Sequence, residues 1–369
     1  MLLENKKAGN MQESNPQTAY DYVMQSHPRG KDYTHPITNT CNRPGRAVTI
    51  DMYTNCMLCV CDGWLPNTVG EITDFERLED IWSNPIAKII QEDVGAKKFT
   101  WCAVDHCGIK LQNNIEPIYQ LVFGIDDSCN LHCPSCRRDQ RMHTTGFLFD
   151  KKLNAVNHTI KLLEAFDPKI HIVLACSGDP LASHIYRPLI HSYKSKSSQT
   201  FTLFTNGLLL KKQLQKASIL DSITRYQISI DAGSAEVYSQ VRYGGDWKIL
   251  MDNLEFLANN KRPNATVSLF YVLQKKNYRD VFNFAKVCEQ FGFHGIISQL
   301  DDWGTWNNQP TNTPDVWTIK NGIYADHNVL DPLHPEWQMC RETIIDLQKI
   351  TPPGVVRLTA QARNLLNLL

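Results

Sequence analysis

The sequence predicts an α/β protein whose main domain is a partial (β/α)6 barrel. Apolar, β-branched runs of strand length recur along the chain, and the segments between them show helical spacing, as in Leu153, Ile160, Leu163 and Phe166. Strands of this kind form a parallel sheet covered by helices, and right-handed crossovers curl it. The six expected strands are residues 119–125, 170–176, 201–205, 226–231, 266–273 and 295–300.

The composition limits the partners and the compartment. The 38 basic and 38 acidic residues give a formal net charge of zero, so neither nucleic acid nor a membrane surface is expected as the main partner. The N-terminus lacks the apolar region of a signal peptide, and no apolar run reaches the roughly 18 residues of a membrane span. Twelve cysteines in metal-like spacings then favour a reducing, cytoplasmic location.

The residue pattern divides the chain into four segments. Residues 1–35 are polar with little periodicity, which predicts a flexible arm and no separate leader-peptide-binding domain. Residues 36–115 are expected to form a small α+β cysteine-rich domain, and residues 116–300 the partial barrel. Residues 301–369 are expected to form a lid or a cover for the barrel. This last segment is rich in aromatic residues, namely Trp303, Trp306, Trp317, Tyr324, His334 and Trp337.

Three cysteines follow the first expected strand in CX3CX2C spacing: Cys129, Cys133 and Cys136. Three thiolates at this spacing fit three corners of one [4Fe–4S] cluster and leave the fourth iron without a protein ligand. Because clusters that only carry electrons normally have a thiolate on every iron, the open iron indicates a binding place for another molecule. The alternative is a zinc knuckle, which needs a fourth ligand. The loop is expected at the carboxyl-terminal mouth of the barrel, where α/β barrels place their chemistry.

This motif resembles that of the radical S-adenosylmethionine (SAM) superfamily, whose fold is also a partial barrel. The resemblance implies that the amino and carboxylate groups of SAM bind the open iron. One electron from the cluster then cleaves the sulfonium and releases a 5′-deoxyadenosyl radical.

The resemblance also implies a SAM pocket at the ends of the later strands. The second strand runs into Ser177, Gly178, Asp179 and Pro180, in the place of the family's Gly-Gly-Glu-type motif that contacts the SAM amino group. There a glycine lets the backbone approach a ligand, and a carboxylate can meet an ammonium. The alternative is an ordinary strand-to-helix turn, which Gly-Asp-Pro forms readily.

Three further residues belong to this implied pocket. Asn206 follows the third strand, and by resemblance Ser229 contacts the SAM ribose and Arg242 approaches its carboxylate. For Asp231, at the end of the fourth strand, the alternative to a place in the pocket is a structural role as the cap of the helix that follows. The position before Cys136, usually aromatic in the family, is Ser135.

A second group of cysteines precedes the barrel. It comprises Cys41, Cys56, Cys59, Cys61, Cys102 and Cys107. The segment is similar to SPASM and twitch domains, although in those enzymes the module follows the barrel. Matching their hairpin suggests Cys41, Cys59, Cys102 and Cys107 as ligands of one auxiliary [4Fe–4S] cluster, with Cys56 or Cys61 as possible substitutes. Structural zinc is the alternative.

Cys340 lies beyond both groups. A thiol S–H bond is weak enough to give a hydrogen atom to a carbon radical, so Cys340 is a candidate hydrogen donor. The alternative is a small buried hydrophobic residue, a role expected for Cys176 and Cys288 as well.

Together these features predict an enzyme that abstracts hydrogen from a C–H bond of a peptide or protein-type substrate, leading to epimerisation, a cross-link or oxidation. The expected electron donor is a flavodoxin or ferredoxin type. The alternatives are the same chemistry on a sugar or other small molecule, or a non-catalytic scaffold that binds zinc or an iron–sulfur cluster.

Overall fold

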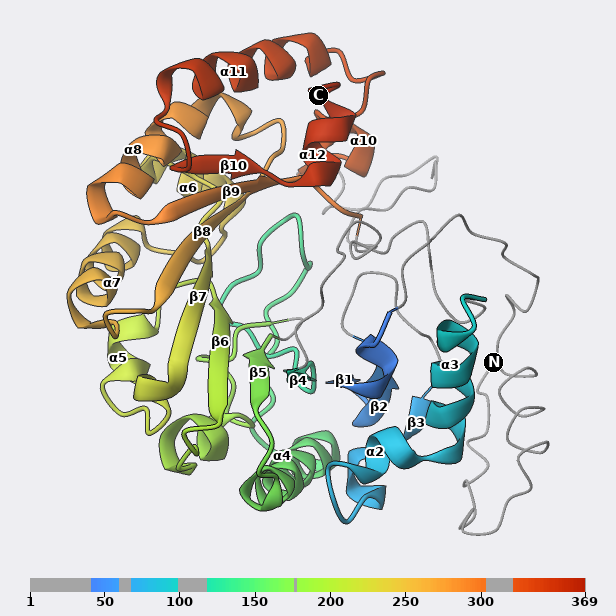
Figure 1. Cartoon of the computed structure of the whole chain (residues 1–369). Helices are drawn as coiled ribbons and strands as arrows, with labels where there is room; N and C mark the ends of the chain where they lie inside the picture. The colour runs from blue at the N-terminus through green and yellow to red at the C-terminus, as the bar shows by residue number, and fades with distance from the viewer. Residues whose placement is uncertain (1–40, 60–67, 99–117, 176–177, 303–320, 369) are drawn as a thin grey trace. The chain divides into compact units, whose positions relative to one another are not determined.

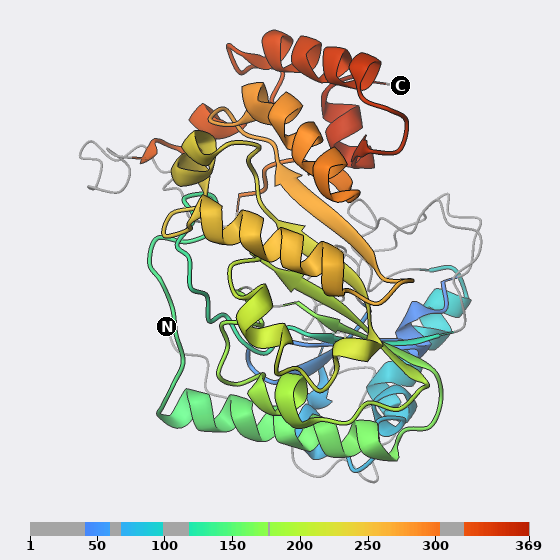
Figure 2. The same cartoon turned by 90° about the vertical axis from the view of Figure 1, so that its left-hand side faces the viewer.

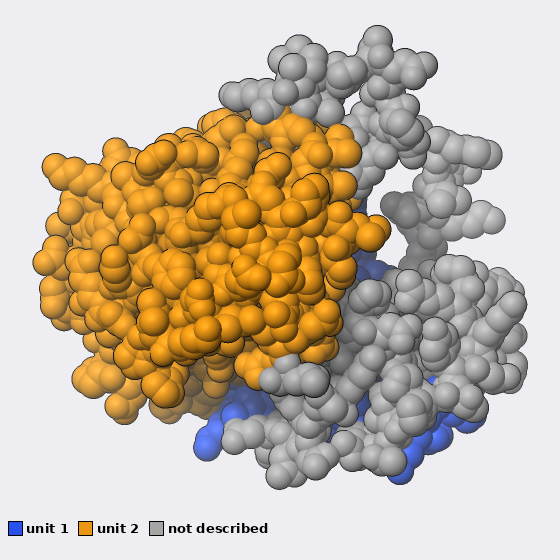
Figure 3. Space-filling view, turned by 90° about the horizontal axis from the view of Figure 1, so that it is seen from above, with its two compact units in different colours: residues 1–122, 158–170 blue, residues 123–157, 171–369 orange. Residues whose placement is uncertain are grey.

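The computed structural model describes residues 41–59, 68–98, 118–175, 178–302 and 321–368. The chain divides into two compact units, which Figure 3 colours separately. The first comprises residues 1–122 and 158–170, and the second comprises residues 123–157 and 171–369. The second unit therefore contains the CX3CX2C loop, and the first contains the cysteine-rich segment.

The second unit is built on a sheet with the strand order β10-β9-β8-β7-β6-β5 (Figure 1). The four pairs from β6 to β10 are parallel. The strands are β5 (Ile170–Leu174), β6 (Gln199–Thr205), β7 (Ile223–Ser229), β8 (Thr266–Val272), β9 (His294–Ser298) and β10 (Val356–Leu358). The predicted α/β class with a largely parallel sheet is thus confirmed, and β10 is a strand that the sequence pattern did not predict.

Helices cover one face of this sheet (Figures 1 and 2). The helices of the second unit are α5 (Leu210–Leu214), α6 (Ala235–Val241), α7 (Trp247–Asn260), α8 (Val281–Phe291), α10 (Tyr324–His327), α11 (Trp337–Ile350) and α12 (Ala360–Leu365), with shorter turns at η4 (Pro188–Ser192), η5 (Leu220–Ser222) and η6 (Tyr278–Asp280). Among the described residues, no helix combines the length and apolarity needed to cross a membrane.

The two faces of the sheet in the second unit differ in polarity. Leu203, Tyr226 and Val267 lie side by side in register and are buried. Their neighbours along the strands, including Gln227 and Ser268, lie on the opposite face and remain partly exposed. Since side chains alternate along a strand, one face packs on helices and the other is a polar inner face.

The first unit contains a sheet of order β4-β1-β2-β3, in which β1, β2 and β3 are antiparallel. Its elements are η1 (Arg43–Gly45), β1 (Ala47–Ile50), β2 (Asn55–Leu58), β3 (Thr68–Glu71), η2 (Ile72–Asp74), α2 (Asp80–Ser83), α3 (Pro85–Gly95), most of β4 (Tyr119–Phe123) and the second half of α4 (Phe147–Ala165). Tyr119 packs on Trp82 and Phe166, with ring centroids 4.8 and 5.2 Å apart. These aromatic contacts give the unit an apolar core.

Candidate active site

The cysteine loop follows β4, as predicted, and its three cysteines differ in exposure. Cys129 and Cys133 are buried, whereas Cys136 is exposed. The Cys129 amide donates to the Arg141 carbonyl at 2.8 Å, and the Cys136 amide donates to the Cys133 carbonyl at 2.9 Å. These bonds fold the loop back on itself and hold the backbone that carries the three thiols.

The environment of the thiols affects their protonation. Burial raises the pKa of the Cys129 thiol to about 11, and the charge of Asp179 adds to the shift. Burial also raises the pKa of Cys133, although the positive charge of Arg242 opposes this effect. Because metal ligands must be deprotonated, iron binding releases protons from these thiols and becomes more favourable as the pH rises.

The turn after β5 packs against the start of the cysteine loop. A Cβ atom at Gly178 would lie 2.1 Å from the Ser128 carbonyl oxygen, so only glycine fits. The Asp179 amide donates to the same oxygen at 2.7 Å. The structure therefore places Gly178, Asp179 and the buried Pro180 beside the residue that precedes Cys129, whereas Ser177 lies outside the described residues.

The Asp179 carboxylate joins the ends of two strands. It accepts hydrogen bonds from the Leu181 amide at 2.8 Å, the Thr205 hydroxyl at 2.8 Å and the Asn206 amide at 2.7 Å. The side chain is buried, and burial raises its pKa while the hydrogen bonds oppose the shift. Three protein donors already bind this carboxylate, which favours its structural role in the turn.

Asn206 and Ser229 occupy two different positions around the loop. The Asn206 amide group donates to Asn130 Oδ1 at 2.9 Å and lies 3.8 Å from Cys129 Sγ. Ser229 is the last residue of β7 and stands in register with Phe270 on the inner face. Asn206 thus contacts the cysteine loop directly, and Ser229 faces the inside of the sheet.

Arg242 connects the end of β7 to the cysteine loop. Its Nη2 lies 2.7 Å from Asp231 Oδ2, and its Nη1 lies 3.8 Å from Cys133 Sγ. The remaining guanidinium donor, Nε, is buried and has no protein partner in the described structure. An unsatisfied buried donor beside the cysteine loop is consistent with a bound carboxylate at this position.

The alternative role of Asp231 as a helix cap is wrong. Ser234 caps α6, because its hydroxyl accepts a hydrogen bond from the Val237 amide. Asp231 has a left-handed backbone with a φ of 53° and accepts a bond from the Val272 amide at 2.8 Å. Its side chain therefore joins β7 to β8 and pairs with Arg242.

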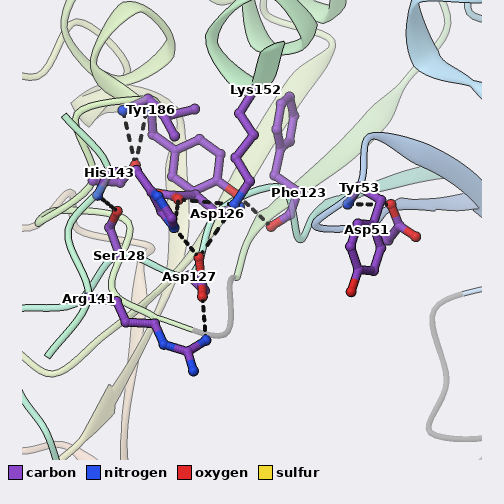
Figure 4. Close-up of polar contacts among 12 residues, drawn as sticks. Asp51, Tyr53, Phe123, Asp126, Asp127, Ser128, Arg141, His143, Lys152 and Tyr186 are labelled. Atoms are coloured by element: carbon purple, nitrogen blue, oxygen red, sulfur yellow. Dashed lines mark hydrogen bonds and ion pairs between the residues drawn. The ribbon is translucent and has the colours of Figure 1, made fainter. Parts of the chain in front are cut away.

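A charged network that the sequence analysis missed lies directly before and after the three cysteines (Figure 4). Asp127 lies 2.7 Å from His143 Nε2, 3.0 Å from Arg141 Nη1 and 3.4 Å from Lys152 Nζ. Lys152 also lies 3.6 Å from Asp126. Burial raises the pKa of Asp127, but the hydrogen bonds from Arg141 and His143 and the Lys152 charge outweigh it and hold the pKa well below its usual range.

This network supports the loop rather than forming a second metal centre. Ligand atoms of Asp126, Asp127 and His143 lie within 4.8 Å of one another. The Lys152 ammonium, however, already contacts the carboxylate oxygens that a cation would need. The His143 amide also donates to the Ser128 hydroxyl at 2.9 Å, so the network holds the residue next to Cys129. The sequence signal that could have predicted this network is the pair of adjacent acidic residues before the motif together with the basic residues after it.

The residues present fit the implied cluster and SAM. Cys129, Cys133 and Cys136 supply a thiolate set for three irons, and Arg242 supplies an unused donor for a carboxylate. Because residue 178 is a glycine, the backbone of the turn after β5 can lie close to the Ser128 backbone, which a larger residue would prevent. The loop and the ends of β5, β6 and β7 therefore meet at one site within the second unit.

The cysteine-rich segment is described only in part. Cys56 is fully buried on β2 opposite Ile50, and burial raises its pKa well above the ordinary value, with added effects of nearby acidic groups. Cys59 follows β2 with a left-handed φ of 78° and is partly exposed, as is Cys41. This contrast favours Cys59 over Cys56 as a ligand. Cys61, Cys102 and Cys107 lie outside the described residues, so the auxiliary cluster stays a prediction.

Cys340 lies in the core of the C-terminal segment. It is fully buried on α11, which packs against η6 and α8, and burial raises its pKa to about 12. Burial raises the pKa of Tyr271, and Cys340 is among the nearby groups that add to the shift. Tyr271 packs on Phe284 of α8 on the helix-covered face, with ring centroids 4.7 Å apart. This position favours the alternative of a buried hydrophobic residue. Trp303, Trp306, Trp317 and Cys176 lie outside the described residues.

A family model described as the Radical SAM superfamily matches residues 126–288, a segment that contains the cysteine loop and Arg242. Among curated proteins, a probable GTP 3′,8-cyclase of Methanococcus maripaludis (strain C7) is 26% identical over 132 residues, covering 36% of this chain and 42% of that protein. The mycofactocin maturase MftC of Mycobacterium ulcerans is 22% identical over 197 residues, covering 53% and 49%. The chain therefore spans less than half the length of these two relatives.

Two solved structures show weaker likeness. Streptococcus suis SuiB bound to precursor peptide SuiA has a TM-score of 0.42 at 13% identity, covering 89% of this chain and 74% of that one. Coproporphyrinogen III oxidase (HemN) from Escherichia coli has a TM-score of 0.41 at 14% identity, covering 63% and 52%.

Proposed function

We propose that the chain is a radical SAM enzyme that abstracts hydrogen from a C–H bond of a peptide or protein-type substrate. The observation that carries the proposal is the three-cysteine loop, which contacts the segments that follow β5, β6 and β7. Cys129, Cys133 and Cys136 would ligate a [4Fe–4S] cluster and leave one iron for SAM. The match to the radical SAM family model, together with the intact three-cysteine loop, speaks against the alternative of a non-catalytic scaffold.

Each part of the site has a role in this reaction. The bound cluster supplies the electron that cleaves the SAM sulfonium. Arg242 would orient the SAM carboxylate with its unused Nε donor, and Asp231 fixes the guanidinium. Gly178 admits the backbone close to the loop, and Asn206 contacts the segment that carries Cys129. Ser229 would contact the ribose from the inner face.

A peptide substrate is supported by two features. The segment before the barrel resembles SPASM and twitch domains, and the mycofactocin maturase is among the similar curated proteins. An auxiliary [4Fe–4S] cluster on Cys41, Cys59, Cys102 and Cys107 would relay an electron or bind the substrate. We infer a reducing, cytoplasmic setting with a flavodoxin- or ferredoxin-type donor, because such clusters are labile to oxygen.

The second candidate is the same chemistry on a small molecule. The similarity to GTP 3′,8-cyclases over 132 residues supports this candidate, with a nucleotide as the substrate. The partly exposed polar residues of the inner face, including Gln227 and Ser268, are compatible with either substrate class.

Two measurements test the proposal. Anaerobically reconstituted, reduced protein should cleave SAM to 5′-deoxyadenosine and methionine, and failure with every reductant over long incubation would overturn it. Deoxyadenosine formation is then compared in the presence of GTP and in the presence of a short precursor peptide, chosen from the genomic neighbourhood where that encodes one. Stimulation by the peptide, with deuterium transfer from it to deoxyadenosine, supports the leading candidate, whereas a GTP-dependent product establishes the second.

A further inference from the structure

A nitrogen donor approaches each of the three cysteine sulfurs of the loop. The contacts are the Leu131 amide to Cys129 Sγ at 3.4 Å, Asn206 Nδ2 to Cys129 Sγ at 3.8 Å, Arg242 Nη1 to Cys133 Sγ at 3.8 Å, and a hydrogen bond from the Arg137 guanidinium to Cys136. The donors come from three different places along the chain. Two of these donors are positively charged, so these contacts stabilise negative charge on the sulfurs and oppose the effect of burial.

The position of Arg242 is fixed from the side opposite Cys133. The Arg242 side chain is only 12% exposed, and its guanidinium is held 2.7 Å from Asp231, whose side chain is 2% exposed. The Asn277 side-chain amide donates to the Asp231 carbonyl at 2.9 Å, and the Val272 amide donates to its carboxylate at 2.8 Å. These bonds hold Asp231 in its left-handed conformation, which is uncommon for a residue with a side chain.

Arg137 is held in a different way. Its Nη1 donates to the Asp127 carbonyl at 2.7 Å, and its guanidinium is less deeply buried than that of Arg242. Charges act more strongly where water is excluded, so the Arg242 contact should have the larger electrostatic effect.

Reduction of a [4Fe–4S] cluster adds one electron and lowers the charge of the cluster and its thiolates by one. Hydrogen bonds to the sulfurs and nearby positive charge stabilise this more negative state and raise the reduction potential. We propose that Arg242 and Arg137 are positioning residues that raise the potential of the SAM-binding cluster through Cys133 and Cys136, and that Asp231 anchors Arg242 for this purpose. This inference rests on the proposed function, because it requires that the loop binds a cluster.

The test compares four reconstituted full-length variants: Arg242→Gln, Arg242→Lys, Arg137→Gln and a control, Arg279→Gln. Arg279 is a more exposed arginine that pairs with Glu336, the N-cap residue of α11, at 2.9 Å. The ratio of reduced to oxidised cluster is measured without SAM by electron paramagnetic resonance, at fixed potentials set with mediators and dithionite. Iron content and circular dichroism of each variant verify cluster loading and folding.

We expect Arg242→Gln to lower this ratio about tenfold at a fixed potential, which corresponds to ~59 mV for a one-electron couple. Arg137→Gln should lower the ratio of reduced to oxidised cluster less than Arg242→Gln does. Arg242→Lys should recover part of the loss because it retains the charge. The control, Arg279→Gln, should have the wild-type ratio. Equal ratios in the wild type, Arg242→Gln and Arg137→Gln would overturn the inference. If Arg242→Gln does not load iron, Arg242→Lys and Arg137→Gln decide the result in the same way.

The outcomes also separate this inference from the proposed function. A wild type that binds iron and cleaves SAM, with no shift in either arginine variant, refutes the inference alone. A wild type that binds no iron refutes the proposed function.

Discussion

The buried loop cysteines of the second unit and the buried cysteine of the first unit occupy opposite environments. In the second unit, Cys129 and Cys133 lie against Asn206, Arg242 and other buried polar groups. In the first unit, Cys56 lies in a strand opposite Ile50, in a sheet whose core is aromatic and aliphatic. Because burying polar groups costs free energy unless they are paired, their concentration around one cysteine loop marks that loop as a functional site. Burial of a cysteine does not by itself mark a functional site.

The largest expected effect comes from removing the loop thiols. Replacing Cys129, Cys133 and Cys136 together by Ala should abolish SAM cleavage and lower the iron content from about eight to about four per chain, since each cysteine group is expected to hold one cluster. The measurement is iron content together with deoxyadenosine yield.

Cys102→Ala and Cys107→Ala give the matched comparison for the first unit. These variants should lose product formation while retaining some SAM cleavage, because the auxiliary cluster is expected to serve the substrate. Normal turnover in both would show that the cysteine-rich segment has a structural role, and stoichiometric zinc without iron uptake would contradict both cluster assignments.

A pair of glycine variants sharpens the comparison between the units. Gly178→Ala places a Cβ against the Ser128 carbonyl oxygen and should displace the cysteine loop, whereas Gly95→Ala, at the end of α3, meets no atom of the described residues within 4 Å. Displacing a reacting group by about 1 Å can cost ~100-fold in rate, so SAM cleavage should fall by this order in Gly178→Ala alone. Equal rates in the two variants would show that the turn after β5 does not position the loop.

Two serine variants test the contrast within the first unit. Cys56→Ser buries a hydroxyl in an apolar strand and should lower the free energy of unfolding by roughly 1–3 kcal/mol, measured by denaturant titration of the apoprotein. Cys59→Ser should change this stability little and instead lower the iron content, because Cys59 is partly exposed and is the expected ligand. The opposite result, with iron lost only in Cys56→Ser, would exchange the two assignments.

The polar inner face of the second unit should also appear in the pH dependence of stability. His171 lies 2.8 Å from both Thr200 and Thr202, and burial together with Arg225 lowers its pKa to about 4. The unfolded chain binds the proton near pH 6.5, so stability is lost as the pH falls from there toward 4. At pH 5 the loss should be ~2 kcal/mol relative to pH 7.

The control for this prediction is His171→Gln, which removes the titrating group. Its unfolding free energy should depend less on pH between 7 and 5 than that of the wild type. Parallel pH profiles for the two proteins would show that His171 does not lose its proton on folding.

Much of the second unit could be predicted from its sequence. Parallel strands buried by helices are long apolar runs, so the strand starting at Ile170 and the one ending at Thr205 are visible as local patterns. The loop thiols are visible because their spacing is local. The contacts of Asp179, Asp231 and Lys152 cannot be read from local patterns, because each depends on which segments meet in space. The helix-cap role of Asp231 was wrong because Ser234 lies closer to the start of α6.

The smallest expected effect concerns Cys340, the candidate hydrogen donor. Its side chain is fully buried beside Tyr271 and Tyr278, on the face of the sheet that α8 covers, whereas the cysteine loop contacts the ends of β5 and β6. Cys340→Ala should therefore lower the free energy of unfolding by about 1 kcal/mol through the small cavity it leaves. Once a substrate is known, the variant should give the wild-type product with the same solvent deuterium content, measured by mass spectrometry. Loss of an inverted product, together with loss of solvent deuterium at that carbon, would instead establish Cys340 as the donor and would require that the C-terminal segment rearranges during turnover.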